Sequence, residues 1–415
     1  MKFSDYNFTE GIRKSLNNMG FKRPTDIQFK SIPNILKGED VLAIAQTGTG
    51  KTAAFAIPII SLLHERKKTH RKDGIKCLVM VPTHELAIQI FEVFEKIAAH
   101  TTVKSMCLIG GVDQDPQIET LNKGVDILIA TPGRIFDLQH QGHLLLHRVE
   151  ILVLDEADHM LKVGFYKDIE DIHRFLPKKR QTLFFSATID AEIKKLAYAL
   201  VKSSAIRIQI SPKDPVNKNV NHAVAMVEAE DKRFFLERIV IENPNSKMLV
   251  FVRTKVRAER VQKAMARVNI STETLHSDKE QEERINILNN FRKGSFKILI
   301  ATDISARGID IDDIDFVINY DLPDKPENYV HRIGRTGRAR KKGEALSLCS
   351  SEEKAMLQEI EAFLDKPIQM MKISKTAYKE TIEIEEEAED DWQSVIKEIE
   401  ALEKELNKPK KKRRK

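Results

Sequence analysis

The sequence predicts an α/β protein with two domains in tandem, each built on a parallel β-sheet. The chain has 415 residues, more than one domain of roughly 150 residues needs. Short apolar runs alternate with longer stretches of helical spacing, and the runs are continuous, as in strands that helices cover on both faces. Ser211–Asn219 interrupts this alternation with two prolines and a single apolar side chain, which predicts a linker.

Composition narrows the class of protein. Hydrophobic residues make up 41% of the chain, which is enough to form cores and excludes a wholly disordered polymer. There is no run of about 18 apolar residues that would span a membrane, and Met1–Tyr6 lacks the apolar core of a signal peptide. The three cysteines are too widely spaced for a disulfide framework or a zinc site. We therefore expect a cytoplasmic protein with no membrane partner.

The expected strands form two sets, one on each side of the linker. Stretches such as Glu85–His100 have the length of the crossover helices that parallel strands require. The first set comprises Val41–Ala45, Cys77–Val81, Ser105–Ile109, Ile127–Ala130, Ile151–Leu154, Thr182–Phe185 and Ile206–Ile210. The second set comprises His222–Val227, Met248–Val252, Thr272–Leu275, Lys297–Ala301, Phe316–Tyr320 and Ala345–Cys349. Past Ile368 the β pattern fades.

The C-terminal extension is short and strongly charged. Seven of the nine residues Glu383–Asp391 are acidic, whereas Lys408–Lys415 holds seven positive charges. The net charge is +6, so without this tail the chain is nearly neutral. Between the two, apolar residues recur at helical spacing from Trp392 to Leu406, which fits either a helix docked on the second domain or a partner-binding helix. The tail is either a solubilising end or a tether for RNA.

A Gly-rich turn connects the first expected strand to a helix. Gln46–Thr52 reads Gln-Thr-Gly-Thr-Gly-Lys-Thr. In such a turn the backbone N–H groups bind phosphate oxygens, Lys51 would reach the β- and γ-phosphates, and Thr52 would bind Mg²⁺. The common pattern has glycine where this chain has Ala45. The alternative, a Gly-rich turn without a ligand, is disfavoured by the strand–turn–helix context.

Acidic residues follow the strand expected at Ile151–Leu154. Ligands of open α/β sheets bind at the carboxyl ends of the strands. Asp155 is suited to Mg²⁺ coordination, and Glu156 to positioning or deprotonating an attacking water. Two acids here are also common as a helix cap, but the Gly-rich turn upstream favours catalysis.

The second domain contains four cations in the eight residues His331–Arg338. Arg335 and Arg338 are three residues apart, so one helical turn would place both on one face. Two guanidinium groups so placed would suit arginine fingers that reach a γ-phosphate. The alternative is a basic loop that contacts RNA.

Together with these residues, an ordered series of motifs over roughly residues 1–370 resembles the DEAD-box RNA helicases of superfamily 2, and among them the bacterial RhlE-like branch. In this family Ala45 is normal, whereas His84 and Ser277 depart from the usual Arg and Gly. In the first domain the matching segments are Phe3 with Gly20–Gln28, Ala45–Thr52, Pro82–Ala87, Gly110–Gly111, Thr131–Arg134, Asp155–Asp158 and Ser186–Thr188. In the second they are Val250–Thr254, His276–Arg284, Ala301–Asp310 and His331–Arg338.

The resemblance implies two RecA-like domains that close over ATP and single-stranded RNA. It divides the chain into a Q-motif region (1–30), an ATP-binding domain (31–210), a linker (211–219), a second domain (220–370) and a C-terminal extension (371–415) with an acidic stretch, an amphipathic helix and a basic tail.

The resemblance also implies a role for each motif residue. Gln28 would read the adenine edge, and Phe3 would stack on the ring. ATP would be bound by these two, by Arg23 and Asp310, and by Ala45, Gln46, Thr47, Gly48, Thr49, Gly50, Lys51 and Thr52. Mg²⁺ would be bound by Thr52 and Asp155. Catalysis would rest on Asp155, Glu156, His331, Arg335 and Arg338, with Asp158, Ser186 and Thr188 coupling hydrolysis to closure. RNA would contact Pro82, Thr83, Gly110, Gly111, Thr131, Pro132, Gly133, Arg134, Arg253, Arg284 and Thr302.

We therefore expect an RNA-dependent ATPase that locally unwinds short RNA duplexes or remodels ribonucleoproteins. Contacts with the RNA backbone predict little sequence preference. An ATP-gated RNA clamp with little unwinding is the main alternative, since the same residues would build it. A DNA translocase is disfavoured by Gln28 and Asp158, and a P-loop ATPase without nucleic acid by the second domain. Ribonucleoprotein and RNA-degradation machinery partners are both compatible with the sequence.

Overall fold

The computed structural model describes residues 1–46, 48–66, 74–210, 216–303, 314–337, 342–374 and 376–382. Several predicted features lie outside the described residues: Thr47, Arg307–Asp310, Arg338, the linker residues 211–215 and the charged extension from Glu383. The described chain forms two compact units. The first consists of Met1–Asn217 and Ser277–Arg292, and the second of Lys218–His276 and the described residues from Lys293 onward.

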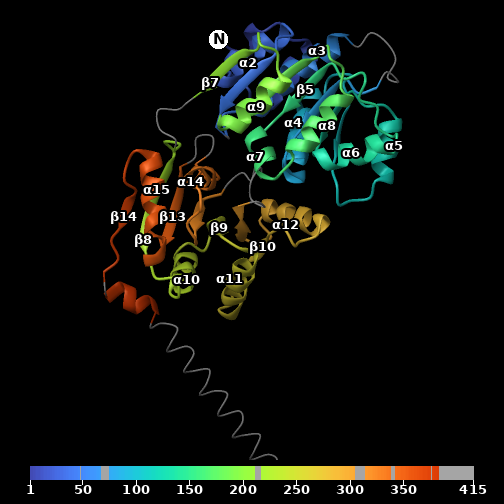
Figure 1. Ribbon diagram of the computed structural model, residues 1–415. Helices are drawn as coiled ribbons and strands as arrows, with labels where there is room; N and C mark the ends of the chain where they lie inside the picture. Colours follow the sequence, from blue (N-terminus) through green and yellow to red (C-terminus); the bar gives the residue numbers. More distant parts are fainter. Residues whose placement is uncertain are drawn as a thin grey trace, which may run out of the picture. The chain divides into compact units, whose positions relative to one another are not determined.

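Each unit contains a seven-stranded sheet whose neighbouring strands are parallel (Figure 1). The strand order is β3-β4-β2-β5-β6-β1-β7 in the first unit and β10-β11-β9-β12-β13-β8-β14 in the second. Counted from the first strand of each unit, the two orders are identical, so the units share one topology. This confirms the predicted fold of two parallel-sheet α/β domains in tandem.

The first unit alternates strands and helices along the chain. Its strands are β1 (Val41–Ala45), β2 (Cys77–Met80), β3 (Ser105–Leu108), β4 (Ile127–Ala130), β5 (Ile151–Leu154), β6 (Gln181–Ser186) and β7 (Ile206–Ile210). Its helices are η1 (Phe3–Asp5), α1 (Glu10–Asn18), α2 (Asp26–Leu36), α3 (Lys51–Arg66), α4 (His84–Ala98), α5 (Asp115–Asn122), α6 (Pro132–His140), α7 (Ala157–Lys162), α8 (Tyr166–Phe175), α9 (Ala191–Leu200) and α12 (Gln281–Lys293).

The second unit repeats this alternation with shorter connections. Its strands are β8 (Val220–Met226), β9 (Met248–Val252), β10 (Glu273–Leu275), β11 (Ile298–Thr302), β12 (Phe316–Asn319), β13 (Gly343–Cys349) and β14 (Gln369–Met371). Its helices are α10 (Lys232–Glu242), α11 (Lys255–Arg267), α14 (Pro326–Ile333), η3 (Ser351–Glu353) and α15 (Lys354–Leu364), followed by a helical segment at residues 376–382.

Every strand expected from the sequence is present, with bounds that differ by at most two residues. Strand β14 was not expected. All three of its residues are exposed, so the apolar run that marks a covered strand is missing there. Its backbone nevertheless pairs in parallel with β8, from Gln369 beside Ala223 to Met371 beside Ala225.

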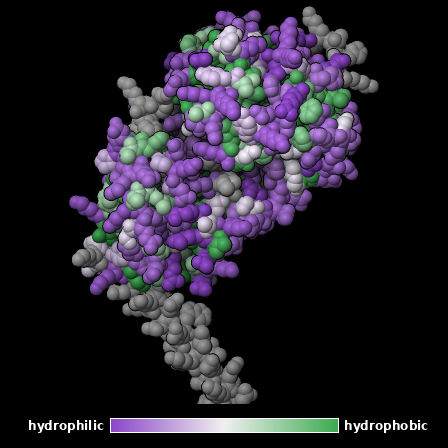
Figure 2. All heavy atoms as spheres, in the orientation of Figure 1, coloured by the Kyte–Doolittle hydropathy of each residue, from purple (hydrophilic) through white to green (hydrophobic). Residues whose placement is uncertain are grey.

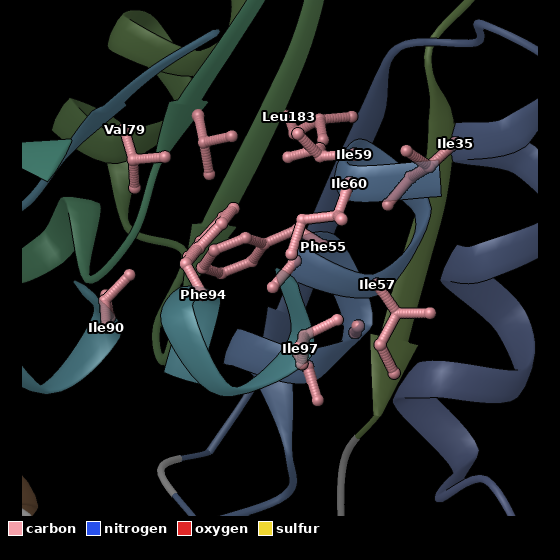
Figure 3. Close-up of a cluster of buried hydrophobic side chains, with 14 of the residues drawn as sticks. Ile35, Phe55, Ile57, Ile59, Ile60, Val79, Ile90, Phe94, Ile97 and Leu183 are labelled. Carbon is pink, nitrogen blue, oxygen red and sulfur yellow. The ribbon is translucent and has the colours of Figure 1, made fainter. Parts of the chain in front are cut away.

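The two faces of the first sheet bury alternate residues of each strand. Val41, Ala43 and Ala45 of β1 belong to the core shared with α1–α4, whereas Leu42 belongs to the core shared with α6–α9. This follows from the two-residue repeat of a strand. Figure 3 shows Phe55 of α3 pointing toward Phe94 of α4, with ring centroids 6.1 Å apart. Helix α3, which begins at the end of the Gly-rich turn Gln46–Thr52 (the P-loop), therefore packs in the centre of this core.

In the second unit α10 and α11 cover one face of the sheet, through apolar side chains such as Leu236 and Val261. Residues 376–382 pack on α10, where the rings of Tyr378 and Phe235 lie 5.0 Å apart. On the surface drawn in Figure 2, hydrophilic side chains predominate and hydrophobic ones form small separate patches.

Candidate functional site

Three neighbouring strands of the first unit carry the predicted ATP-site residues at their carboxyl ends. In the sheet, β6 lies between β5 and β1. The P-loop follows β1, Asp155 follows β5, and Ser186 is the last residue of β6. Ligands of open parallel sheets bind outside such strand ends. The topology therefore gathers residues that are more than 100 positions apart in sequence.

The P-loop has a left-handed backbone at two glycines. The φ angles are +79° at Gly48 and +88° at Gly50, a region that side chains rarely adopt. Lys51 begins α3, is 6% exposed, and donates from Nζ to the carbonyl oxygen of Ala45 at 3.0 Å. Ala45 ends an extended strand and contributes only its carbonyl, so no glycine is needed there.

Two Q-motif side chains, Thr25 and Gln28, donate hydrogen bonds to backbone carbonyls of the P-loop. Gln28 donates from Nε2 to Gly50 O at 3.1 Å, and its Oε1 accepts from Thr25 N at 2.9 Å. The hydroxyl of Thr25 donates to Thr49 O at 2.8 Å. A Cβ at Gly50 would lie 2.5 Å from Gln28 Nε2. A primary amide has two N–H groups and two acceptor lone pairs, so Gln28 keeps one of each for a ligand.

Asp155 is a buried carboxyl group, 2% exposed, immediately after β5. Burial raises its pKa to about 6, since the charged form loses its hydration. The positive charge of Lys51 acts in the opposite direction and lowers this pKa, while Glu156 and Asp158 raise it. A second cation at this position would favour the ionised carboxylate further.

Glu156 adopts a left-handed conformation, with φ +52° and ψ +46°, at the N-cap of α7. Non-glycine residues in this region are uncommon and strained, and they cluster at functional sites. The Glu156 N–H donates to Asp155 Oδ1 at 3.0 Å. His159 Nδ1 lies 3.6 Å from Glu156 Oε2, beyond hydrogen-bond distance.

Asp158 connects β5 to β6 through three hydrogen bonds. Its Oδ1 accepts from Ser186 Oγ at 3.0 Å and from Ala187 N at 3.3 Å, and its Oδ2 accepts from Thr188 Oγ1 at 3.4 Å. Asp158 is 4% exposed and Ser186 is fully buried. These contacts join the two segments that the sequence assigned to coupling.

Of the two other residues predicted to contact ATP from the Q-motif region, Phe3 is buried and Arg23 is exposed. The ring of Phe3 is 4% exposed and packs edge-on against Phe21, with centroids 5.5 Å apart. Arg23 is exposed. Stacking of Phe3 on a base stays a prediction, and it requires part of this ring surface to open toward the nucleotide.

The RNA-side residues of the first unit lie at the starts of helices and in tight turns. Thr83 caps α4, where its hydroxyl accepts the Leu86 N–H at 3.2 Å. Thr131 caps α6, which begins at Pro132 and Gly133. Arg134 donates to Val112 O at 2.8 Å. This bond ties α6 to the turn that holds Gly110 and Gly111, where Gly111 has φ +69°.

Two predicted RNA-contact arginines are engaged with carboxylates. Arg284, in α12, donates to Glu85 Oε1 at 2.6 and 2.8 Å. Arg253, after β9, donates to Glu353 Oε1 at 3.0 Å and pairs with Asp324 at 3.2 Å. Binding of an RNA phosphate by either arginine would have to share or displace these contacts. Thr302 is the last residue of β11.

The placement of Arg335 and Arg338 on one face stays a prediction. Helix α14 ends at Ile333 and is capped by Gly334, so Arg335 lies in a turn after the helix, and Arg338 lies outside the described residues. Arg335 is 6% exposed and donates from Nε to the carbonyl of His331 at 3.2 Å. Gly337, at φ +68°, approaches Asn219 and Val220 too closely for a side chain.

Sequence reasoning missed the buried ion pairs of the second unit. Arg332 is 2% exposed and donates to both carboxylate oxygens of Asp303, at 2.6 and 2.8 Å. Asp303 thereby neutralises Arg332, one of the four cations in His331–Arg338. Lys232 is fully buried and donates to Glu353 Oε2 at 2.5 Å and to Tyr320 O at 2.7 Å. Both pairs join residues far apart in sequence, which explains why spacing gave no signal.

Among the residues that the structure describes, no three or more His, Cys, Asp or Glu side chains form a metal-binding group. Over the same described ranges, no helix has the length and apolar character that a bilayer crossing requires.

The fold and the site define a two-domain P-loop nucleoside triphosphatase whose second unit repeats the topology of the first. Comparison with known proteins gives the family. The family model of the DEAD/DEAH box helicases matches residues 25–196, and that of the helicase conserved C-terminal domain matches residues 231–340.

Curated relatives and solved structures agree with this assignment. The chain is 39% identical to the DEAD-box ATP-dependent RNA helicase RhpA of Helicobacter pylori over 373 residues, which cover 89% of this chain and 74% of that protein. It is 40% identical to the ATP-dependent RNA helicase CshA of Listeria monocytogenes over 368 residues, covering 89% and 70%. The structure of S. cerevisiae Dbp5 bound to RNA and ADP BeF3 matches with TM-score 0.80 and 29% identity, over 92% of this chain and 98% of that one. Mss116p bound to ssRNA and AMP-PNP matches with TM-score 0.80 and 29% identity, over 91% and 80%.

The chain belongs to the DEAD-box helicases. Its two units are RecA-like domains, and it is an ATP-dependent RNA helicase, an enzyme whose ATP hydrolysis depends on RNA. The match to the RhlE-like branch stays a prediction.

Proposed function

We propose that this helicase hydrolyses ATP at the carboxyl ends of β5, β6 and β1, and that closure of its two domains on RNA locally unwinds short duplexes or remodels ribonucleoproteins. The observation that carries the proposal is the juxtaposition of Lys51 with the buried Asp155. Among the described residues, the buried lysine donates to a backbone carbonyl and to no carboxylate, so it is available to phosphate, whereas a carboxyl group with a raised pKa is available to a cation.

The residues around Asp155 fit a magnesium ion. Asp155 and Thr52 supply carboxylate and hydroxyl oxygens, which Mg²⁺ prefers, and Mg²⁺ keeps several waters besides one or two protein ligands. A site with so few protein ligands agrees with the finding that the described residues form no larger metal-binding group. When bound with ATP, the ion neutralises charge on the phosphate oxygens. We assign Thr52 and Asp155 as its protein ligands.

Glu156 is proposed as the group that positions and deprotonates the attacking water. It follows Asp155 directly and has a left-handed backbone at the N-cap of α7, a conformation that clusters at functional sites. Gln28 is proposed to read adenine with its remaining N–H and lone pair, since adenine offers an acceptor and a donor at N7 and N6. A guanine base reverses the donor at position 6 and leaves one group unpaired, which favours ATP over GTP.

In the second domain we propose Arg335 and Arg338 as the arginine fingers and His331 with Asp310 as their neighbours at the nucleotide. The Asp158–Ser186–Thr188 contacts are proposed to transmit phosphate loss from the β5 segment to the β6 segment. RNA is proposed to bind through its backbone at the motif residues of both domains, and the solved neighbours bound to RNA support this partner. A cytoplasmic location and ribonucleoprotein partners are further parts of the proposal.

Steady-state ATP hydrolysis tests these roles. We expect strong stimulation by single-stranded RNA, weak stimulation by DNA of the same sequence, and a loss of RNA-stimulated activity in Glu156→Gln on the order of 100-fold or more. Equal stimulation by DNA would contradict the RNA assignment, and a fully active Glu156→Gln would remove that residue from the hydrolysis step.

A strand-displacement assay separates unwinding from clamping. Displacement of a short RNA duplex in the presence of ATP supports local unwinding. Tight ATP-dependent RNA binding without displacement would instead support the ATP-gated clamp.

A further inference from the structure

A basic groove lies in the second domain where α10 and α11 pack side by side (Figure 1). It has a volume of about 360 Å³, and five of its nine lining residues are Arg or Lys. These cations are Arg233, Arg257, Arg260, Lys263 and Arg267. None of them belongs to a motif that the family resemblance identified; Arg257 comes three residues after the end of the Val250–Thr254 segment. The groove therefore has no role in the ATP site proposed above.

The cations follow the geometry of one helix. Arg257, Arg260, Lys263 and Arg267 are separated by three or four residues, so they lie along one side of α11. At a rise of 1.5 Å per residue, the ten residues from Arg257 to Arg267 span about 15 Å. Several positive charges are thus arranged in a row rather than around a point.

Most of this row is not neutralised within the chain. Arg257 pairs with Asp321 at 3.2 Å, and its guanidinium lies 5.5 Å from the ring centroid of Tyr320. Across the described residues, Arg260, Lys263 and Arg267 have no carboxylate partner, and all three are exposed. Neighbouring like charges repel, so an anionic partner would relieve a cost that the free protein carries.

Apolar and aromatic side chains complete the lining. Val261 and Ala264 lie on α11 together with the row, whereas Ala229 and Tyr320, which is 5% exposed, lie outside that helix, as does the cation Arg233 of α10. Burial raises the pKa of Tyr320 to about 12, so its hydroxyl is neutral and remains a hydrogen-bond donor. A compact anion such as a single phosphate would be held best by cations that converge on it, whereas this row suits a longer anionic chain.

We propose that this groove binds the phosphodiester backbone of RNA, as a contact additional to the motif residues. Guanidinium groups bind phosphate through two parallel hydrogen bonds, and a row of them follows a strand without reading its bases. The inference rests on the established activity as an RNA helicase. It adds an anchor on the second domain that requires neither ATP nor the P-loop, and so gives the enzyme a hold on RNA between hydrolysis cycles.

The test uses the full-length protein and a labelled, unstructured 30-nucleotide RNA without nucleotide, across a series of salt concentrations. In Arg260→Ala/Arg267→Ala we expect RNA affinity to fall about tenfold at low salt. The slope of log affinity against log salt should become shallower by about 1.4, since each lost phosphate contact contributes roughly 0.7 on a single strand. An Arg260→Lys/Arg267→Lys variant should retain most of the affinity.

The matched control is Lys354→Ala/Lys372→Ala. Both lysines are exposed in the second unit, outside the groove, and no described carboxylate pairs with them. This control removes the same net charge and should change affinity less than twofold. In the groove variant, kcat for ATP hydrolysis at saturating RNA should equal that of the wild type, with only the RNA concentration for half-stimulation raised. Circular dichroism checks that both variants fold.

Four results would overturn the proposal. RNA affinity equal to that of the wild type would exclude the groove as a contact, and an equal loss in the control would show that only net charge matters. A lower kcat at saturating RNA would place these arginines in the catalytic core instead. If removal of the groove cations increased RNA affinity, the groove would be assigned to the acidic Glu383–Asp391 stretch as a competitor of RNA.

Discussion

Lys51 and Lys232 occupy equivalent positions in the two domains but have different hydrogen-bond partners. Lys51 is the first residue of the helix after β1, and Lys232 is the first residue of the helix after β8. These two strands hold the same place in the order of their sheets. Among the described residues, Lys51 donates to the carbonyl of Ala45 and to no carboxylate, whereas Lys232 donates to the carboxylate of Glu353 as well as to a carbonyl. The first lysine is proposed to bind an external anion, and the second already binds an internal one.

The groups around each lysine differ in the same way. Glu353 follows β13, the strand equivalent to β6, and it also accepts from Ser350 N at 3.1 Å and Leu322 N at 3.1 Å. Burial alone would raise its pKa, but the Lys232 ammonium and these N–H groups hold the pKa of Glu353 below its usual value. In the first domain the pKa of Asp155 is raised instead. With one topology, the first domain places Lys51 and Asp155 where we propose a ligand site, whereas the second forms a buried ion pair between Lys232 and Glu353.

The largest effect should follow from removing the internal cation. Lys232→Met removes the buried cation of Glu353 and Asp321, which keep only the partly exposed Arg253 and Arg257, so we expect the free energy of unfolding of the second domain to fall by about 3 kcal/mol. Chemical denaturation followed by circular dichroism measures this. The double variant Lys232→Met/Glu353→Leu should recover much of the loss, and an undiminished stability in the single variant would contradict the comparison.

Lys51→Met should have the opposite signature. The variant has no ammonium group to bind the phosphates of ATP, so RNA-stimulated hydrolysis should fall on the order of 100-fold. Stability should change less than in Lys232→Met. Among the described residues Lys51 donates no hydrogen bond to a carboxylate, so the variant loses the bond to Ala45 O and the favourable charge beside Asp155, whose carboxyl group can instead take up a proton. Parallel ATPase and thermal-melt measurements check both parts. A stability loss as large as that of Lys232→Met would show that both lysines stabilise the fold to the same extent, which would contradict the comparison.

Asp155→Asn should stabilise the ligand-free protein while abolishing hydrolysis. The folded-state pKa of about 6 lies above the unfolded value of 3.8, so ionisation of Asp155 opposes folding. The wild type therefore loses stability as pH rises from about 4 to about 6, by up to about 3 kcal/mol. The variant lacks this loss because Asn does not ionise. Its side-chain oxygen still accepts the Glu156 N–H, so that hydrogen bond is kept.

Melting curves of both proteins from pH 4 to pH 8 test this. The advantage of the Asn variant should vanish near pH 4 and be full above pH 6.5. A variant that is less stable than the wild type at pH 7 would show that Asp155 is already well satisfied in the folded protein.

The smallest effect should come from Ser186→Ala. Its hydroxyl donates to Asp158, which keeps the Ala187 N–H and the Thr188 hydroxyl as donors. We expect a loss of about 1 kcal/mol in stability, typical of one hydrogen bond to a charged group that retains others. Thr188→Ala, at the longer distance of 3.4 Å, should lose less. The reverse order would mean that Thr188 is the stronger partner.

The sequence predicted the strands well and the long-range contacts poorly. Covered strands leave continuous apolar runs, so β1, β4, β5, β7 and β9 were found with their observed bounds. The exposed β14 has no such signal. Arg253 and Arg284 were predicted as RNA contacts from motif position alone, and their pairing with Glu353 and Glu85 could not be read from spacing.

By itself, the sequence determined the local features: strand and helix periodicity, the glycines that give the P-loop its left-handed turns, and the motif series of a DEAD-box helicase. Only the tertiary structure decided which charges are free to act. Burial and pairing depend on side chains brought together from distant segments, such as Lys232 with Glu353, 121 residues apart. Desolvation and pairing set the pKa and the availability of a charged group. Lysines at equivalent positions therefore differ: Lys232 forms a structural ion pair, whereas Lys51, which donates to no carboxylate among the described residues, is proposed to bind the nucleotide.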